Sequence, residues 1–287
     1  METYDAKTDI WRSASLAFSR NTVTDVIRYR DFSQLDWVSS LCSREKNITT
    51  YLELMEVVYR KMAKYYRCEY VFKNEIIKNL IKGYRKGDKS VVFNEFRVAD
   101  SIVDLAMFNG GSKAFEIKTE FDNSKRLEKQ IKAYRRVFDK CFVVVSEDKL
   151  HDYIPYIDDT TGIITLTYNK GHIRLVQQRD AVQNDSIDIE SLFRCLRTKE
   201  YEHIVASYYG KLPDVGQDVK FDACMELVSR IPIPTLKRLY LNEIKKRKSN
   251  LSHLRGIPHP LAQLCISLNL KDNEVTSLIN TLSTKIC

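Results

Sequence analysis

Three residues in the middle of the chain have side chains suited to metal-assisted chemistry: Asp104, Glu116 and Lys118. On a strand, the tripeptide Glu116-Ile117-Lys118 places the carboxylate and the ammonium on one face and Ile117 on the other. Asp104 lies inside the apolar run IVDLAMF, where a carboxylate is costly to bury without a partner. Neighbouring carboxylates repel each other unless a cation joins them, and Mg²⁺ is held by one or two carboxylates plus waters. The pattern therefore predicts a Mg²⁺ or Mn²⁺ site.

Such a site suits the hydrolysis of a phosphodiester bond. The ion polarises a phosphoryl oxygen and lowers the pKa of a bound water, while a lysine positions that water or offsets charge developing on the phosphate. Glu95 is a candidate third carboxylate, and Gln130 a candidate contact to the water or the lysine. We predict Asp104, Glu116 and Glu95 as metal ligands, and these three with Lys118 and Gln130 as the catalytic set. The alternative is a plain ion pair on a half-exposed strand.

The elements that must position these residues lie between residues 90 and 177. The segments VVFNEF, IVDLAMF and KAFEIKT are rich in β-forming residues, and NGGS between the last two indicates a hairpin turn. A helix is expected over 124–138, capped by Asp122, Asn123 or Ser124. The buried strand CFVVVS and a hairpin turning at 169–171 follow. This order predicts an α/β fold with a mixed central sheet flanked by helices.

The rest of the chain is expected to be helical. Apolar residues recur at helical spacing over 8–66, with Thr49 or Thr50 as a cap after the polar stretch CSREKNITT, and again over 70–84. Helical patterns return from Asp188 onward. We therefore predict a helical N-terminal region at 1–66, a core at 67–185 and a helical C-terminal region at 186–287. The last region is either a separate domain or a cover on the same core.

The order of these residues resembles the PD-(D/E)XK, or restriction-endonuclease-like, nuclease superfamily, and within it a bacterial and phage family of nuclease-like proteins. The resemblance covers roughly residues 60–205 and rests on Glu69-Tyr70-Val71-Phe72-Lys73-Asn74, Glu95, Asp104, Glu116-Ile117-Lys118, Asp122, Arg126-Leu127, Gln130, Tyr134 and 141–145. The chain departs from the superfamily pattern at Val103, where a proline often precedes the aspartate. The resemblance implies a restriction-endonuclease-like sheet with helical N- and C-terminal extensions, and a Mg²⁺- or Mn²⁺-dependent nuclease that hydrolyses DNA.

The net charge of +8 suits a polyanionic partner. Residues 118–140 contain eight Lys or Arg against four Asp or Glu, and residues 235–256 contain seven against one. The candidate nucleic-acid contacts are Lys125, Arg126, Lys129, Arg136, Lys245 and Lys246. DNA is the expected partner and RNA the alternative; a protein partner and the oligomeric state stay open.

Several of these residues also have purely structural interpretations. The run KKRK at 245–248 is typical of a solvated helix end. Asp122 and Arg126 are expected either to form a surface pair or to bind substrate. Glu69-Tyr70 and Lys73-Asn74 are expected to pin a helix to the core. A fold of this kind also serves as a catalytically inactive nucleic-acid-binding or protein-interaction module, for instance in phage defence or toxin immunity.

Other classes of protein and site fit the sequence poorly. No stretch approaches the ~20 apolar residues of a membrane span, and the acidic, polar N-terminus does not resemble a secretory signal, so the expected location is the cytoplasm. The seven cysteines are odd in number and include no CxxC pair, which disfavours disulfides and a cysteine-rich zinc site. His253 and His259 are expected to be loop or surface residues rather than metal ligands.

Overall fold

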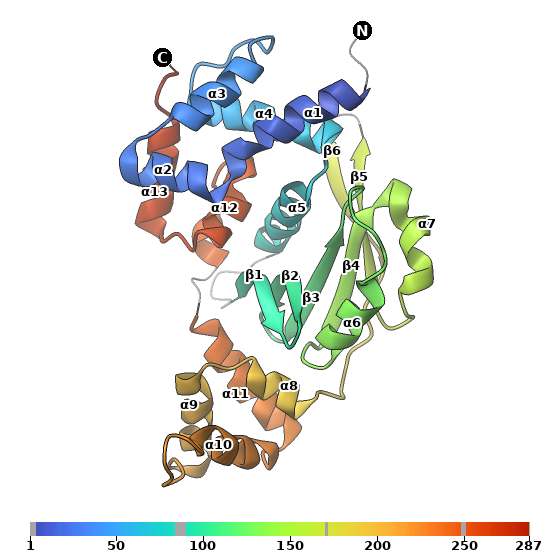
Figure 1. Cartoon of the computed structure of the whole chain (residues 1–287), viewed down its shortest axis with the longest axis vertical. Helices are drawn as coiled ribbons and strands as arrows, with labels where there is room; N and C mark the ends of the chain where they lie inside the picture. Colours follow the sequence, from blue (N-terminus) through green and yellow to red (C-terminus); the bar gives the residue numbers. More distant parts are fainter. Residues whose placement is uncertain (1–3, 84–89, 170–171, 248–250, 287) are drawn as a thin grey trace.

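The computed structural model describes residues 4–83, 90–169, 172–247 and 251–286, and its centre is a six-stranded mixed sheet (Figure 1). The strands lie side by side in chain order: β1 (Val91–Val98), β2 (Ser101–Phe108), β3 (Ser112–Lys118), β4 (Lys140–Ser146), β5 (Gly162–Asn169) and β6 (His172–Arg179). The pairs β1–β2, β2–β3 and β5–β6 are antiparallel, whereas β3–β4 and β4–β5 are parallel. The predicted α/β fold with a mixed sheet is confirmed.

The local sequence explains the central strands. Asn109, Gly110 and Gly111 make the turn between β2 and β3, closed by a hydrogen bond from the Asn109 N–H to the Gly111 carbonyl (3.0 Å). Strand β4 is apolar along nearly its whole length because helices cover both faces of the sheet. The β5–β6 hairpin is present as predicted, although residues 170 and 171 of its turn lie outside the described residues.

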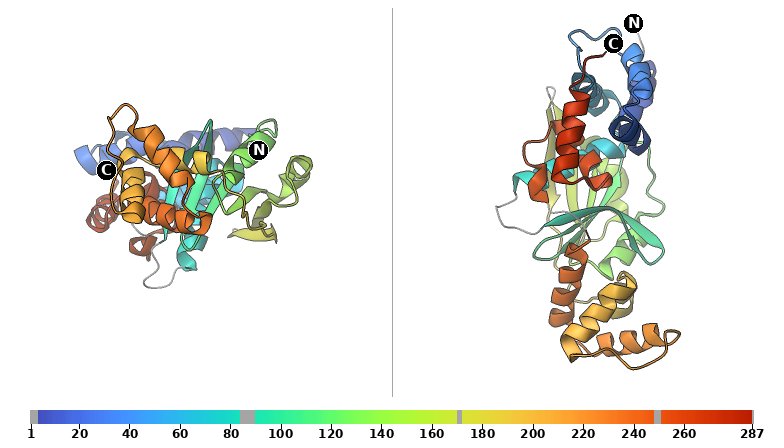
Figure 2. Two further views of the ribbon diagram at one scale, coloured as in Figure 1. Left: turned by 90° about the horizontal axis from the view of Figure 1, so that it is seen from below. Right: turned by 90° about the vertical axis from the view of Figure 1, so that its left-hand side faces the viewer.

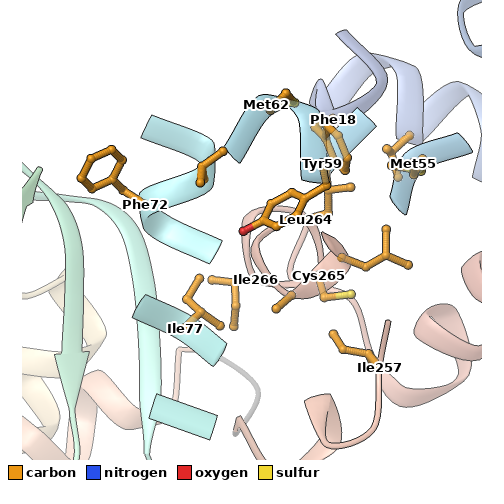
Figure 3. Close-up of a cluster of buried hydrophobic side chains, with 14 of the residues drawn as sticks. Phe18, Met55, Tyr59, Met62, Phe72, Ile77, Ile257, Leu264, Cys265 and Ile266 are labelled. Atoms are coloured by element: carbon orange, nitrogen blue, oxygen red, sulfur yellow. The ribbon is translucent and has the colours of Figure 1, made fainter. Parts of the chain in front are cut away.

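One face of the sheet carries the N-terminal helices and the last two helices of the chain. These are α1 (Tyr4–Ala14), α2 (Arg20–Tyr29), α3 (Ser33–Leu41), α4 (Tyr51–Tyr65), α5 (Glu69–Lys82), α12 (Ala262–Ser267) and α13 (Asp272–Leu282). Thr50 caps α4 in a capping box with Glu53, as predicted. Figure 3 shows the apolar core between these helices, where Phe18 and Met55 lie near Leu264 and Cys265 from the far end of the chain.

The other face carries α6 (Leu127–Arg135) and α7 (Leu150–Tyr153), and a small helical bundle packs at one end of the sheet. The bundle contains α8 (Ile189–Arg194), α9 (Thr198–Tyr209), α10 (Lys220–Ser229) and α11 (Ile233–Lys245). Short 3-10 turns are η1 (Ser15–Phe18), η2 (Glu147–Lys149), η3 (Ile154–Tyr156), η4 (Leu251–Leu254) and η5 (His259–Leu261). Helix α6 is shorter than the predicted 124–138.

The predicted cap of α6 is wrong. Its N-cap residue is Arg126, which makes no side-chain cap hydrogen bond. The Asp122 carboxylate instead accepts hydrogen bonds from the N–H (2.8 Å) and hydroxyl (2.7 Å) of Thr119, which closes a turn directly after β3. No ion pair between Asp122 and Arg126 occurs among the described residues.

Residues 186–287 are divided between the two helical layers. The helices α8–α11 share a core with α6 and one face of the sheet, whereas α12 and α13 join the N-terminal helices at the opposite end of the molecule (Figure 2). The described cysteines are all free thiols, in line with the sequence. Within the described residues, no helix has the length and apolar character needed to span a membrane.

Candidate functional site

The antiparallel pairing of β2 and β3 brings Asp104 next to Glu116. Leu105 pairs with Phe115 and Ala106 with Ala114, so the register, continued by one residue, sets Asp104 opposite Glu116. At that point the two strands begin to separate, and the Asp104 carboxylate accepts the Ile117 backbone N–H through Oδ2 (2.7 Å). The predicted antiparallel hairpin is confirmed, and it brings the two acids together.

The Glu116 carboxylate is almost fully buried, with an exposed fraction of 1%, and both of its oxygens have partners. The Lys118 ammonium donates to Oε1 (2.8 Å), and the Tyr134 hydroxyl donates to Oε2 (2.7 Å). Lys118 also donates to the Gln130 side-chain carbonyl (3.1 Å). Residues from β2, β3 and α6 therefore converge, and Asp104, Glu116, Lys118 and Gln130 form one cluster as the sequence predicted.

The acids of this cluster are protonated more easily than ordinary carboxylic acids. Burial, followed by the negative charge of Glu116, raises the pKa of Asp104 to about 8, against the lowering effect of the Ile117 N–H. Burial also raises the pKa of Glu116, opposed mainly by Lys118. At neutral pH, burial and the repulsion between the two carboxylates therefore favour retention of a proton on Asp104. A cation is the alternative way to relieve this repulsion.

The donor set fits a hard divalent ion. Two carboxylates on adjacent strands match the one or two protein carboxylates that Mg²⁺ takes, with oxygens of water or phosphate completing its shell. The predicted third ligand does not join them. Among the described residues, no group of three or more His, Cys, Asp or Glu side chains lies close enough to hold a metal ion.

The backbone at Glu95 explains why this residue stays apart. Asn94 pairs with Leu105 and Phe96 with Val103, so Glu95 and Asp104 occupy the same interruption of the β1–β2 ladder. Glu95 has a left-handed φ of 57°, which is rare for a non-glycine residue and breaks the alternation of side chains along β1. Its side chain is consequently exposed, whereas Glu116 is buried. The structure does not bring Glu95 together with Asp104 and Glu116, and its role as a metal ligand stays a prediction.

Glu95 instead lines a neighbouring cavity of about 350 Å³. Glu69 and Lys73 of α5 line the same cavity and form an ion pair with each other. Both are near enough to Asp104 to affect its pKa, Glu69 raising and Lys73 lowering it. The side-chain amide of Asn94, also in the cavity wall, has no hydrogen-bond partner among the described residues.

Other residues of the α5 segment pin the helix, as predicted. The Tyr70 hydroxyl donates to the Pro260 carbonyl (2.5 Å). Asn74 donates to the His259 carbonyl (2.9 Å) and accepts from the Gln263 N–H (3.0 Å). The contact between Tyr134 and Glu116 was not predicted, although Tyr134 is among the residues on which the resemblance rested. Its position one turn after Gln130, on the face turned to Glu116, was the available signal.

The candidate nucleic-acid contacts fall into two groups. Lys125, Arg126 and Lys129 are exposed at the start of α6, the end that carries Gln130 toward Lys118. Arg136 lies at the other end of α6. The α11 lysines are also remote from Lys118, because Lys245 bonds to the Asn109 carbonyl, before the start of β3, and Lys246 pairs with Glu243 (2.7 Å). Lys248 of the KKRK run lies outside the described residues.

Comparison with known proteins corrects the family expected from the motif. Residues 62–259 match the family described as Bacteriophage P4 protein cII. Protein cII of Enterobacteria phage P4 is 25% identical over 190 residues, which cover 60% of this chain and 68% of that protein. No solved structure matches the chain.

The resemblance to the PD-(D/E)XK superfamily was therefore wrong as a family assignment, and the nuclease and hydrolase labels that rested on it have no support from the family. It rested on a few short, separated motifs that recur by chance in strands and helices, whereas the family match spans more than half of the sequence. The chain belongs to the bacteriophage P4 protein cII family.

Proposed function

We propose that this chain is a divalent-metal-dependent phosphodiesterase that cleaves DNA. The observation that carries the proposal is the pair of buried, adjacent carboxylates on β2 and β3, with a lysine hydrogen-bonded to one of them. The proposal depends on these side chains and not on the corrected family assignment. We also propose that the sheet has the restriction-endonuclease-like arrangement. The position of the two acids beside the crossover from β3 through α6 to β4 supports this.

Asp104 and Glu116 would hold Mg²⁺ or Mn²⁺. When bound, the ion supplies Lewis acidity, which polarises a phosphoryl oxygen and lowers the pKa of a water. Hydrogen bonds within the chain hold the two carboxylates in position for the ion. The Ile117 N–H fixes one oxygen of Asp104, and Tyr134 fixes one oxygen of Glu116, so little side-chain freedom is lost on binding.

Lys118 would act on the phosphate. Lys118 is 7% exposed, and its ammonium is held between the Glu116 carboxylate and the Gln130 carbonyl. A fixed positive charge in a poorly solvated place stabilises negative charge that develops in a transition state. Lys125, Arg126 and Lys129 at the start of α6 would attract the nucleic-acid backbone toward this group.

The second candidate is a module without turnover, which binds nucleic acid or a protein partner, for instance in phage defence or toxin immunity. The separation of Glu95 from the two other acids favours it, since a two-carboxylate site is weaker than a three-carboxylate site. A nuclease requires metal binding at Asp104 and Glu116, whereas a module of this kind does not.

The test is a calorimetric titration with Mn²⁺ beside a plasmid-nicking assay with and without EDTA. The wild-type chain should bind Mn²⁺ and nick the plasmid only without EDTA. Glu116→Gln keeps the shape of the side chain and removes its charge, so it should lose both properties. Glu128→Gln is the matched control, because Glu128 is exposed on α6 and pairs with the exposed Lys132. Equal Mn²⁺ isotherms for wild type and Glu116→Gln would refute the proposal.

A further inference from the structure

A second cavity, of about 590 Å³, lies between α4, α5, β6 and the turn η5. It involves none of the residues of the carboxylate pair. Helix α5 connects the two places: Glu69 and Lys73 near its start lie beside Asp104, whereas Glu75 and Asn79 further along line this cavity. Its size is within the range of small-molecule sites.

A buried acid orients a histidine at the wall of this cavity. Glu75 is 5% exposed, and its Oε1 accepts the Tyr59 hydroxyl (2.6 Å) and lies 2.5 Å from His259 Nε2. Asn74, fully buried, donates to the Tyr59 hydroxyl (3.0 Å). Figure 3 shows Tyr59 amid the apolar side chains of this region, so its polar end has few other partners. The His259 side chain, by contrast, is half exposed.

The hydrogen bonds of Glu75 decide which nitrogen of His259 is available. Since Nε2 faces the carboxylate, Nδ1 is the ring nitrogen left to meet a ligand. In the protonated ring, Nδ1 also carries a hydrogen and can donate it to an anion. His259 is thereby prepared as a hydrogen-bond donor to an anion.

The charges around the cavity are mainly positive. Arg60 of α4, Lys82 of α5 and Arg174 of β6 are exposed and line it, and the described residues offer none of the three a carboxylate partner. Of the two acids in the lining, Glu75 is already satisfied by Tyr59 and His259, which leaves Glu56. Besides Tyr59 and Asn79, the rest of the lining is apolar, namely Ala63, Ile173, Leu175, Val176 and Pro260.

We propose that this cavity binds a phosphorylated small molecule of nucleotide size. The cations of three separate elements and the His259 ring would hold the phosphate, since guanidinium and ammonium groups are the usual protein partners of phosphate oxygens. The apolar wall would cover the uncharged body of the ligand. This site is independent of the proposed phosphodiesterase activity. A ligand bound here would contact Ala63 and His259, which lie at the two ends of the segment 62–259 that matches the family.

The test is isothermal titration of the full chain with AMP, inorganic phosphate and adenosine. AMP should bind more tightly than inorganic phosphate, and adenosine at least ~10-fold more weakly than AMP because it lacks the anion. Arg174→Glu and Arg60→Glu, on different elements, should each weaken AMP binding ~10-fold or more. Lys211→Glu, an exposed residue of the distant helical bundle, is the matched control and should leave it unchanged.

His259→Gln separates the oriented histidine from general positive charge. It should weaken AMP binding although Arg60, Lys82 and Arg174 keep their charges. Circular dichroism checks that each variant is folded. Absence of AMP and phosphate binding at millimolar concentration would overturn the proposal. Equal affinity of the wild type and both arginine variants would overturn it too, and phosphate binding as tight as AMP binding would overturn the role of the apolar wall.

Discussion

Glu116 and Glu75 are both buried acids that accept a hydrogen bond from a tyrosine, yet their surroundings have opposite charge balance. Glu116 has a second acid, Asp104, beside it and a single lysine as counter-charge. Glu75 has His259 beside it and three further cations around the neighbouring cavity. The first place therefore has more acids than bases, and the second has more bases than acids.

The difference shows how the neighbours of a buried acid decide what the place can bind. A buried carboxylate is tolerated only with a partner, so each acid must be neutralised within the fold. Where a buried acid has too little positive charge beside it, as at Asp104, the remaining repulsion between carboxylates favours the binding of a proton or of an added cation. Where the acid is matched by a histidine, as at Glu75, surrounding cations remain available to an anion.

Removal of the Lys118 ammonium, which is the counter-charge of Glu116, should have the largest effect on plasmid cleavage. Lys118→Ala should keep Mn²⁺ binding, because the carboxylates remain, and should reduce plasmid cleavage on the order of 100-fold or more, as is usual for a lost charge-stabilising group. Lys132→Ala, an exposed lysine of α6, is the control. Cleavage by Lys118→Ala within a few-fold of wild type would remove Lys118 from the catalytic set.

The two tyrosines allow a matched comparison of the two acids. Tyr134→Phe and Tyr59→Phe each delete one hydroxyl that donates to a buried carboxylate, so each should lower the free energy of unfolding by about 1–3 kcal/mol. Urea denaturation measures both. Only Tyr134→Phe should weaken Mn²⁺ binding, and only Tyr59→Phe should weaken AMP binding. If either variant changed both ligands, the two places would not be independent.

Much of the carboxylate cluster was predictable because its residues are close together in the sequence. Alternation within Glu116-Ile117-Lys118 and a three-residue turn at 109–111 suffice to set Asp104 near Glu116. Glu95 was misplaced because its left-handed φ leaves no mark in the residue type. The α6 cap was misplaced because Asp122 has a competing partner in Thr119.

The second cavity was beyond prediction, because its parts are far apart in the sequence. Glu75 and His259 meet only because α12 and the preceding turn return to the N-terminal helices, and nothing near either residue indicates that return. His259 therefore looked like an ordinary loop residue. The same long-range packing divides residues 186–287 between two layers, although their helical patterns look alike in the sequence.

The smallest expected effect is the pH dependence of the free energy of unfolding that Asp104 causes. Its pKa is about 8 in the folded chain, against an ordinary value of 3.8, so the folded state holds the proton between these values while the unfolded state has lost it. The contribution of Asp104 to the free energy of unfolding therefore falls as pH rises from about 4 to about 8. Asp104→Asn removes this titration and still offers an oxygen to the Ile117 N–H.

Asp104→Asn should therefore match wild type near pH 4 and exceed it at pH 8.5, by on the order of 1 kcal/mol once partial solvation of the site is allowed for. Thermal unfolding in EDTA at both pH values measures the difference, since EDTA removes any cation that would offset the repulsion. Asp159→Asn is the control, because Asp159 is fully exposed and should give no such trend. A wild-type advantage that grows with pH would mean that Asp104 is stabilised as a carboxylate. The cluster would then have no excess negative charge to attract a cation, and the contrast with Glu75 would fail.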